Sequence, residues 1–146
     1  SIHELKKKLF KKNPNITKNK DTHDRVWISM SKHRRPVHNI DEIRPILKKY
    51  DFKEVVLESL SLVDKLNLMK NVKILVGAHS SGLTNMLFME KGSLIVDIRD
   101  PKDKIKNAFF SLASELDLDY YYMEREDNNY TIINPKKLDK LLSSIT

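Results

Sequence analysis

Residues 77–85 read Gly-Ala-His-Ser-Ser-Gly-Leu-Thr-Asn, and this stretch decides the fold that the rest of the sequence predicts. It follows an apolar run, Ile74–Val76, and opens a segment in which apolar residues recur at helical spacing. A strand that enters a helix through a glycine-bounded turn directs several backbone N–H groups and the positive end of the helix dipole to one place. The glycine turn, residues 77–82, is therefore predicted to bind a phosphate or another anion.

Short apolar runs alternate with helical periodicity on both sides of this turn. Other strands are expected at 25–29, 55–57, 94–98 and 120–123, and helices at 2–9, 43–50, 62–69, 105–116 and 138–145. This alternation is typical of an α/β fold with a Rossmann-like, mostly parallel sheet and helices on both faces. We expect residues 1–24 to form a basic helix and linker, and residues 25–146 to form one Rossmann-like domain.

The composition is that of an ordinary globular chain with an uneven charge. The 146 residues are 40% apolar and 32% charged, with a net charge of +7 and no cysteine. Residues 1–50 hold 14 Lys and Arg against 5 Asp and Glu, whereas residues 51–146 hold 13 against 15. A basic half suits nucleic acid, an anionic membrane surface or a phosphorylated ligand. The absence of cysteine and of a long apolar run predicts a cytoplasmic location with at most peripheral membrane contact.

The glycine turn is close to two known phosphate-binding motifs and matches neither. A P-loop needs lysine where Leu83 stands, and a dinucleotide fingerprint needs glycine where His79 stands. The imidazole of His79 is nevertheless suited to donate to a phosphate oxygen. A purely structural turn is the alternative.

Two other segments that follow predicted strands carry charged candidates. Arg34 and Arg35 follow the strand at 25–29 and could clamp phosphates, although one of them is more simply a solvated loop residue. Glu58 follows the next strand and could accept hydrogen bonds from ribose hydroxyls, with an exposed loop carboxylate as the alternative. Because carboxyl ends of parallel strands share one edge, these segments are expected to converge there with the glycine turn.

An ordered series of motifs gives the chain a resemblance to a known family. The series is Ile28-Ser29, Arg35-x-x-x-Asn39-x-x-Glu42, Glu58-x-Leu60-Ser61 and the stretch from Gly77 to Phe88. Over about residues 25–123 it resembles the C-terminal half of glycosyltransferase family 61, the capsular polysaccharide type. The resemblance implies one half of a GT-B architecture and inverting transfer from a UDP-sugar to a glycan acceptor.

The resemblance also implies roles for particular residues. The diphosphate would be bound by His79 with Ser80, Ser81 and Gly82, Arg35 would add charge, Glu58 would face the ribose or base, and Asn85 would brace the turn or reach the donor. The family commonly has arginine where this chain has Met30, and Arg34 is the candidate replacement. The catalytic base is expected in an N-terminal α/β half outside this chain, and neither a metal nor a cofactor is expected beside the UDP-sugar co-substrate.

Two alternatives belong to other functional classes. Met30 and the short length motivate a non-catalytic module that binds a nucleotide sugar but has lost transfer. The basic first half motivates a nucleic-acid binder, which is not expected because the sequence lacks a recognised reader motif and interleaved aromatic residues.

Overall fold

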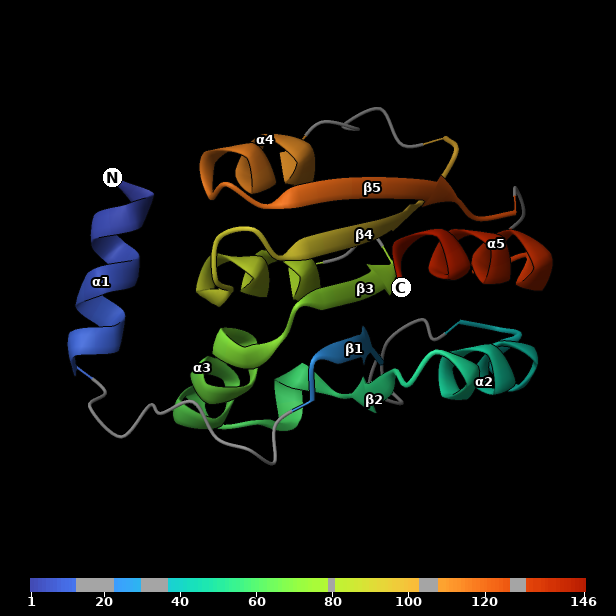
Figure 1. Cartoon of the computed structure of the whole chain (residues 1–146), viewed down its shortest axis with the longest axis horizontal. Coiled ribbons are helices and arrows are strands. Elements are labelled where there is room, and N and C mark those ends of the chain that lie inside the picture. Colours follow the sequence, from blue (N-terminus) through green and yellow to red (C-terminus); the bar gives the residue numbers. More distant parts are fainter. Residues whose placement is uncertain (13–22, 30–36, 79–80, 103–107, 127–130) are drawn as a thin grey trace.

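The computed structural model describes residues 1–12, 23–29, 37–78, 81–102, 108–126 and 131–146. Over these residues the core is a five-stranded sheet in the order β2-β1-β3-β4-β5, and all neighbouring pairs are parallel (Figure 1). The strands are β1 Arg25–Ile28, β2 Lys53–Val55, β3 Ile74–Ala78, β4 Leu94–Arg99 and β5 Asp119–Glu124. The predicted α/β fold with a parallel sheet is confirmed.

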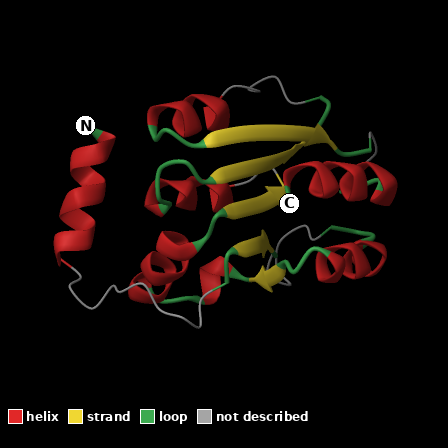
Figure 2. Ribbon diagram, in the orientation of Figure 1, coloured by secondary structure: helices red, strands yellow, loops and turns green. Residues whose placement is uncertain are grey.

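Helical segments connect the strands and cover both faces of the sheet (Figure 2). Helices α2 and α5 pack on one face, and α3, η2 and α4 pack on the other. The helical segments are α1 Ile2–Lys12, α2 Ile40–Lys49, η1 Leu57–Ser59, α3 Leu62–Asn71, η2 Ser81–Phe88, α4 Ala108–Glu115 and α5 Pro135–Ile145, of which η1 and η2 are 3-10 helices. The expected helix at the N-terminus is confirmed as α1, and Lys6 donates from Nζ to the Met89 carbonyl.

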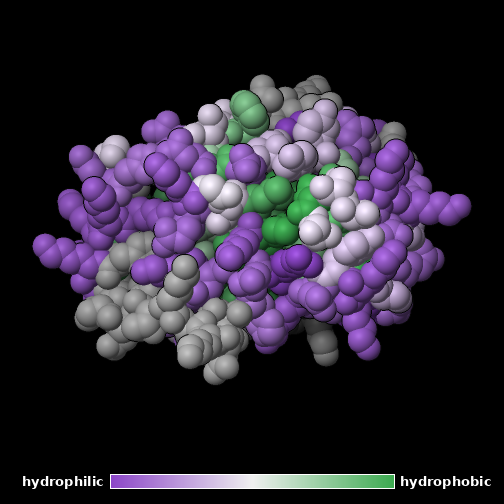
Figure 3. Space-filling view, in the orientation of Figure 1, coloured by the Kyte–Doolittle hydropathy of each residue, from purple (hydrophilic) through white to green (hydrophobic). Residues whose placement is uncertain are grey.

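The central strands are buried on both faces, because successive side chains point to opposite sides of a sheet. Trp27 and Val76 pack with α2 and α5, whereas their neighbours Ile28 and Leu75 pack with η2 and α4. Figure 3 shows apolar residues near the middle of one side of the molecule, bordered mostly by hydrophilic ones. Two separate apolar layers therefore fix the sheet between its helices.

The structure differs from the sequence prediction in a few local respects. Strand β2 ends at Val55, and Leu57 is instead buried in η1, because β2 pairs with β1 over only three residues. Asn39 occupies the N-cap position of α2, but its side chain accepts no capping hydrogen bond from a backbone N–H of this helix. Its side chain instead donates to the Ile133 carbonyl at 2.7 Å and accepts from the Ile133 N–H at 3.0 Å, which ties α2 to the segment before α5. Of the helix expected at 105–116, residues 105–107 lie outside the described part.

Candidate functional site

The strand order places a switch point between β1 and β3. The chain leaves β1 for β2 on one side and then crosses to β3 on the other side of β1. In an open parallel sheet, ligands bind outside the carboxyl ends of the strands at such a reversal. Here those ends are Ile28 and Ala78, and the glycine turn starts at one of them. The ends of β1, β2 and β3 are neighbours, as the sequence predicted.

Gly77 allows η2 to lie close against the sheet. A Cβ atom at this position would lie 3.2 Å from Ile28 Cδ1 and 3.3 Å from Leu83 Cδ2. Leu83 and Met86, one helical turn apart on η2, are both fully buried. A side chain here would press on both neighbours, so glycine favours the close approach of three elements, which holds the N-terminus of η2 at the carboxyl edge of β3.

The predicted residues of the glycine turn are described only in part. His79 and Ser80 lie outside the described residues, and Ser81 and Gly82 form the first turn of η2. Asn85 lies within η2 and is half-buried. The backbone therefore places the end of the turn at the switch point, while the role of each side chain stays a prediction.

Of the charged candidates that follow the neighbouring strands, Glu58 is among the described residues, whereas the two arginines are not. Glu58 lies in η1, directly after β2, and is exposed. Arg34 and Arg35 lie outside the described residues. Ser29, which follows β1, donates from its N–H to the Val55 carbonyl at 2.9 Å and from Oγ to Glu54 at 3.3 Å. Its hydroxyl thus helps to join the ends of β1 and β2.

A polar cluster that the sequence analysis missed lies beside the turn, on the same face of the sheet. We call it the β4–β5 cluster, and its members are Asp97, Arg99, Tyr120 and Tyr122. The side chain of Asp97 is 0% exposed and that of Arg99 is 8% exposed. The Tyr120 hydroxyl donates to Asp97 Oδ2 at 2.6 Å, and Arg99 donates to the same hydroxyl from Nε at 3.1 Å and Nη2 at 2.7 Å.

Further contacts complete this cluster. Arg99 Nε lies 3.5 Å from Asp97 Oδ2, and the guanidinium carbon lies 4.1 Å from the centre of the Tyr122 ring. Burial, and after it the hydrogen bond to Asp97, raises the pKa of Tyr120 to about 12. The sequence does contain a pattern that could have indicated this cluster. Asp97 and Arg99 are charged residues at alternate positions of an otherwise apolar strand, and Tyr120 and Tyr122 have the same spacing on the next strand.

The raised pKa of Tyr120 predicts a loss of stability in alkaline solution. Below about pH 10 the phenol is protonated in both the folded and unfolded chains, so it makes its full contribution to the free energy of unfolding. Between about pH 10 and about 12 the unfolded chain releases this proton while the folded chain keeps it, so the free energy of unfolding falls. We expect the stability advantage of the wild type over Tyr120→Phe to shrink across this range in denaturant titrations. A stability advantage that stays constant from pH 9 to pH 12 would contradict the raised pKa of Tyr120.

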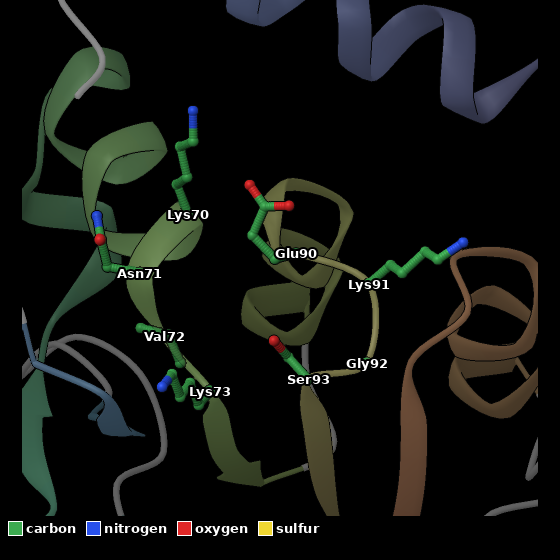
Figure 4. A pocket seen from close by; sticks show the side chains of 8 residues that line it. All are labelled: Lys70, Asn71, Val72, Lys73, Glu90, Lys91, Gly92 and Ser93. Carbon is green, nitrogen blue, oxygen red and sulfur yellow. The ribbon is translucent and has the colours of Figure 1, made fainter. Parts of the chain in front are cut away.

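A hollow of about 260 Å³ lies at the opposite, N-terminal end of the strands, between the end of α3 and the turn that precedes β4. Lys70, Lys73, Glu90 and Lys91 are among the residues that line it, and Figure 4 shows Lys70 and Glu90 pointing away from the strands. It lies beyond the N-terminal ends of β3 and β4. It is therefore separate from the switch point.

Neither a metal site nor a membrane span is found in the part of the chain that the structure describes. Across the described ranges, no three His, Cys, Asp or Glu side chains are grouped so that they could hold a metal ion. None of the helices in this part of the chain is both long enough and apolar enough to cross a membrane.

Comparison with known proteins relates this chain to one described family and to a curated relative. The family model described as Glycosyltransferase 61 matches residues 2–96. The chain is also similar to the EGF domain-specific O-linked N-acetylglucosamine transferase of Drosophila melanogaster, with 31% identity over 108 residues. That similarity covers 72% of this chain and 20% of the relative, so the chain spans about a fifth of the relative's length.

Proposed function

This chain belongs to glycosyltransferase family 61, and from that premise we propose that it is the donor-binding half of an inverting glycosyltransferase that uses a UDP-sugar. The observation that carries the proposal is the glycine turn, which leaves β3 at the switch point and opens η2. Backbone N–H groups at such a helix start suit the diphosphate of a nucleotide sugar. Gly77 supports this arrangement because it lets η2 pack closely against Ile28.

The proposed donor site uses residues from three neighbouring strand ends. His79 and the backbone of residues 80–82 bind the diphosphate, and Arg35 adds positive charge. Arg34 takes the place of the arginine that the family commonly has where this chain has Met30. Glu58 follows β2 and is exposed, so that it can accept hydrogen bonds from the ribose or the base. Asn85 braces the turn from within η2.

The proposed reaction needs groups from outside this chain. An acceptor hydroxyl attacks the anomeric carbon of the donor, the bond from that carbon to the UDP oxygen breaks, and the configuration inverts. The hydroxyl proton passes to a base in an N-terminal α/β half that also lines the glycan acceptor cleft. Fixed donors at the turn stabilise the charge on the departing UDP, so that neither a metal nor another cofactor is required. The cytoplasmic location stays a prediction.

Titration with UDP tests the donor site, with His79→Ala as the decisive variant. We expect the wild type to bind UDP and His79→Ala to weaken binding by about 1–3 kcal/mol, the scale of a lost hydrogen bond to a charged group. His3→Ala is the matched control. His3 is exposed on α1, and this helix lies beyond the N-terminal ends of the strands, away from the glycine turn (Figure 1). Calorimetry or amide chemical shifts provide the measurement.

Several results would overturn this proposal. They are the absence of any response to millimolar UDP, an unchanged affinity in His79→Ala, and strong salt-dependent binding of single-stranded RNA without a UDP response. Because the relative's name specifies N-acetylglucosamine, UDP-N-acetylglucosamine is the first complete donor to test.

A further inference from the structure

The β4–β5 cluster places an ion pair where the sheet is otherwise apolar. Leu75 and Ile95, on the same face, are fully buried hydrophobic residues, whereas Asp97 and Arg99 follow at the next alternate positions of β4. A buried ion pair is often no more stabilising than apolar residues of similar volume, because both charges lose hydration. Stability alone therefore does not explain this pair, and its position suggests a role at the neighbouring site.

The strand register places the cluster next to the glycine turn. Gly77 pairs with Asp97, which in turn pairs with Tyr122, so these three residues form one row across β3, β4 and β5. Ala78 pairs with Ile98, and Arg99 is the next residue of β4. With strands spaced about 4.8 Å apart and a rise of about 3.3 Å per residue, the Arg99 Cα lies roughly 6 Å from that of Ala78.

The cluster also orients the charge of Arg99. Asp97 lies two residues further from the carboxyl edge than Arg99, so the positive member of the pair is the one nearer the ligand side. The guanidinium is fixed by two hydrogen bonds to the Tyr120 hydroxyl and by the Tyr122 ring at 4.1 Å. A guanidinium carries five N–H donors, so these two bonds leave donors for an anion. A cation that is fixed before the ligand arrives needs little reorganisation.

We propose that Arg99 binds the phosphate groups of the nucleotide sugar at the end of β3, and that Asp97 and Tyr120 are positioning residues that hold its guanidinium. The inference rests on the proposed function, since it needs the donor diphosphate at the glycine turn. Arg99 would add a cation from β4 to Arg34 and Arg35, the cations expected after β1. The family match ends at residue 96, so it does not extend to Arg99.

Arg99→Lys and Arg99→Gln test this role with UDP, UMP and uridine as separate ligands. We expect both variants to lose at least about tenfold in UDP affinity, as for a lost charge-assisted hydrogen bond, and to leave uridine binding unchanged. Tyr120→Phe, which removes the hydroxyl but keeps the ring, should give a smaller loss with the same selectivity for phosphate. Arg44→Lys is the matched control, because Arg44 forms its ion pairs with Asp41 and Glu54 on the α2 side of the sheet.

The wild type provides a measurement that does not depend on how the variants fold. The Arg99 Nε–H resonance should shift when UDP is added and stay in place with uridine. If that resonance does not move with UDP, or if folded Arg99 variants bind UDP as the wild type does, the inference is wrong while the donor site stands. Equal losses for UDP and uridine would indicate a structural role and also overturn the inference. A wild type that binds no UDP would instead remove the proposed function.

Discussion

Gly77→Val is expected to destabilise the protein by about 2–3 kcal/mol and to lower UDP affinity by roughly tenfold or more. The new side chain would enter a space in which even a single Cβ atom lies 3.2 Å from Ile28 and 3.3 Å from Leu83. Since Ile28 and Leu83 are both buried, η2 has to move away from the sheet to make room. That movement displaces the N–H groups at the start of η2, and it is measured by chemical denaturation together with UDP titration.

Two further variants show whether close packing is the cause. Ile28→Val removes Cδ1, the atom that would lie nearest to a new Cβ at position 77, and should recover part of the stability lost in Gly77→Ala. Gly92 is the matched control because it has a φ of +86° but no atom within 4 Å of a new Cβ. Gly92→Ala should therefore cost about 1 kcal/mol through its backbone and leave UDP affinity unchanged. If Gly77→Val binds UDP like the wild type, the turn does not depend on this contact.

The sequence was sufficient to predict the sheet because its central strands are buried on both faces. Val26, Trp27 and Ile28 are apolar in succession, which is the pattern of a parallel strand between two helical layers. The Rossmann-like alternation then placed the ends of β1, β2 and β3 at one edge. The glycine turn was found for the same reason, since it directly follows an apolar run and leads into the next helical segment, although the structure extends β3 through Gly77 to Ala78.

Contacts between residues that are far apart in the chain could not be predicted from the sequence. Asp97 and Tyr120 are joined by a hydrogen bond across 23 positions, and nothing near either residue specifies which strand is its neighbour. Asn39 shows the same limit, because its side chain bonds not only Glu42 of its own helix but also the backbone of Ile133, 94 positions away. Local periodicity can identify a strand or a helix start, whereas the partner of a polar side chain depends on strand order and register.

Asp97→Ala is expected to have the largest effect on stability, a loss of about 3–5 kcal/mol. The substitution leaves the guanidinium of Arg99 nearly buried without its carboxylate and removes the acceptor of the Tyr120 hydroxyl. Asp119→Ala is the matched control, because Asp119 is exposed on β5 and should cost less than about 0.5 kcal/mol. Denaturant unfolding of both variants measures the difference, and a cost below about 1 kcal/mol for Asp97→Ala would contradict a buried ion pair.

The double variant Asp97→Ala with Arg99→Met separates the cost of an unpaired charge from the cost of lost packing. Once the guanidinium is gone, no buried charge lacks a partner in this cluster, so the double variant should be more stable than Asp97→Ala alone. A double variant that is no more stable would mean that packing, and not charge, accounts for the loss. If Arg99 also binds phosphate, the recovered stability will not restore UDP affinity, because the apolar side chain that stabilises the sheet has no donor for the diphosphate.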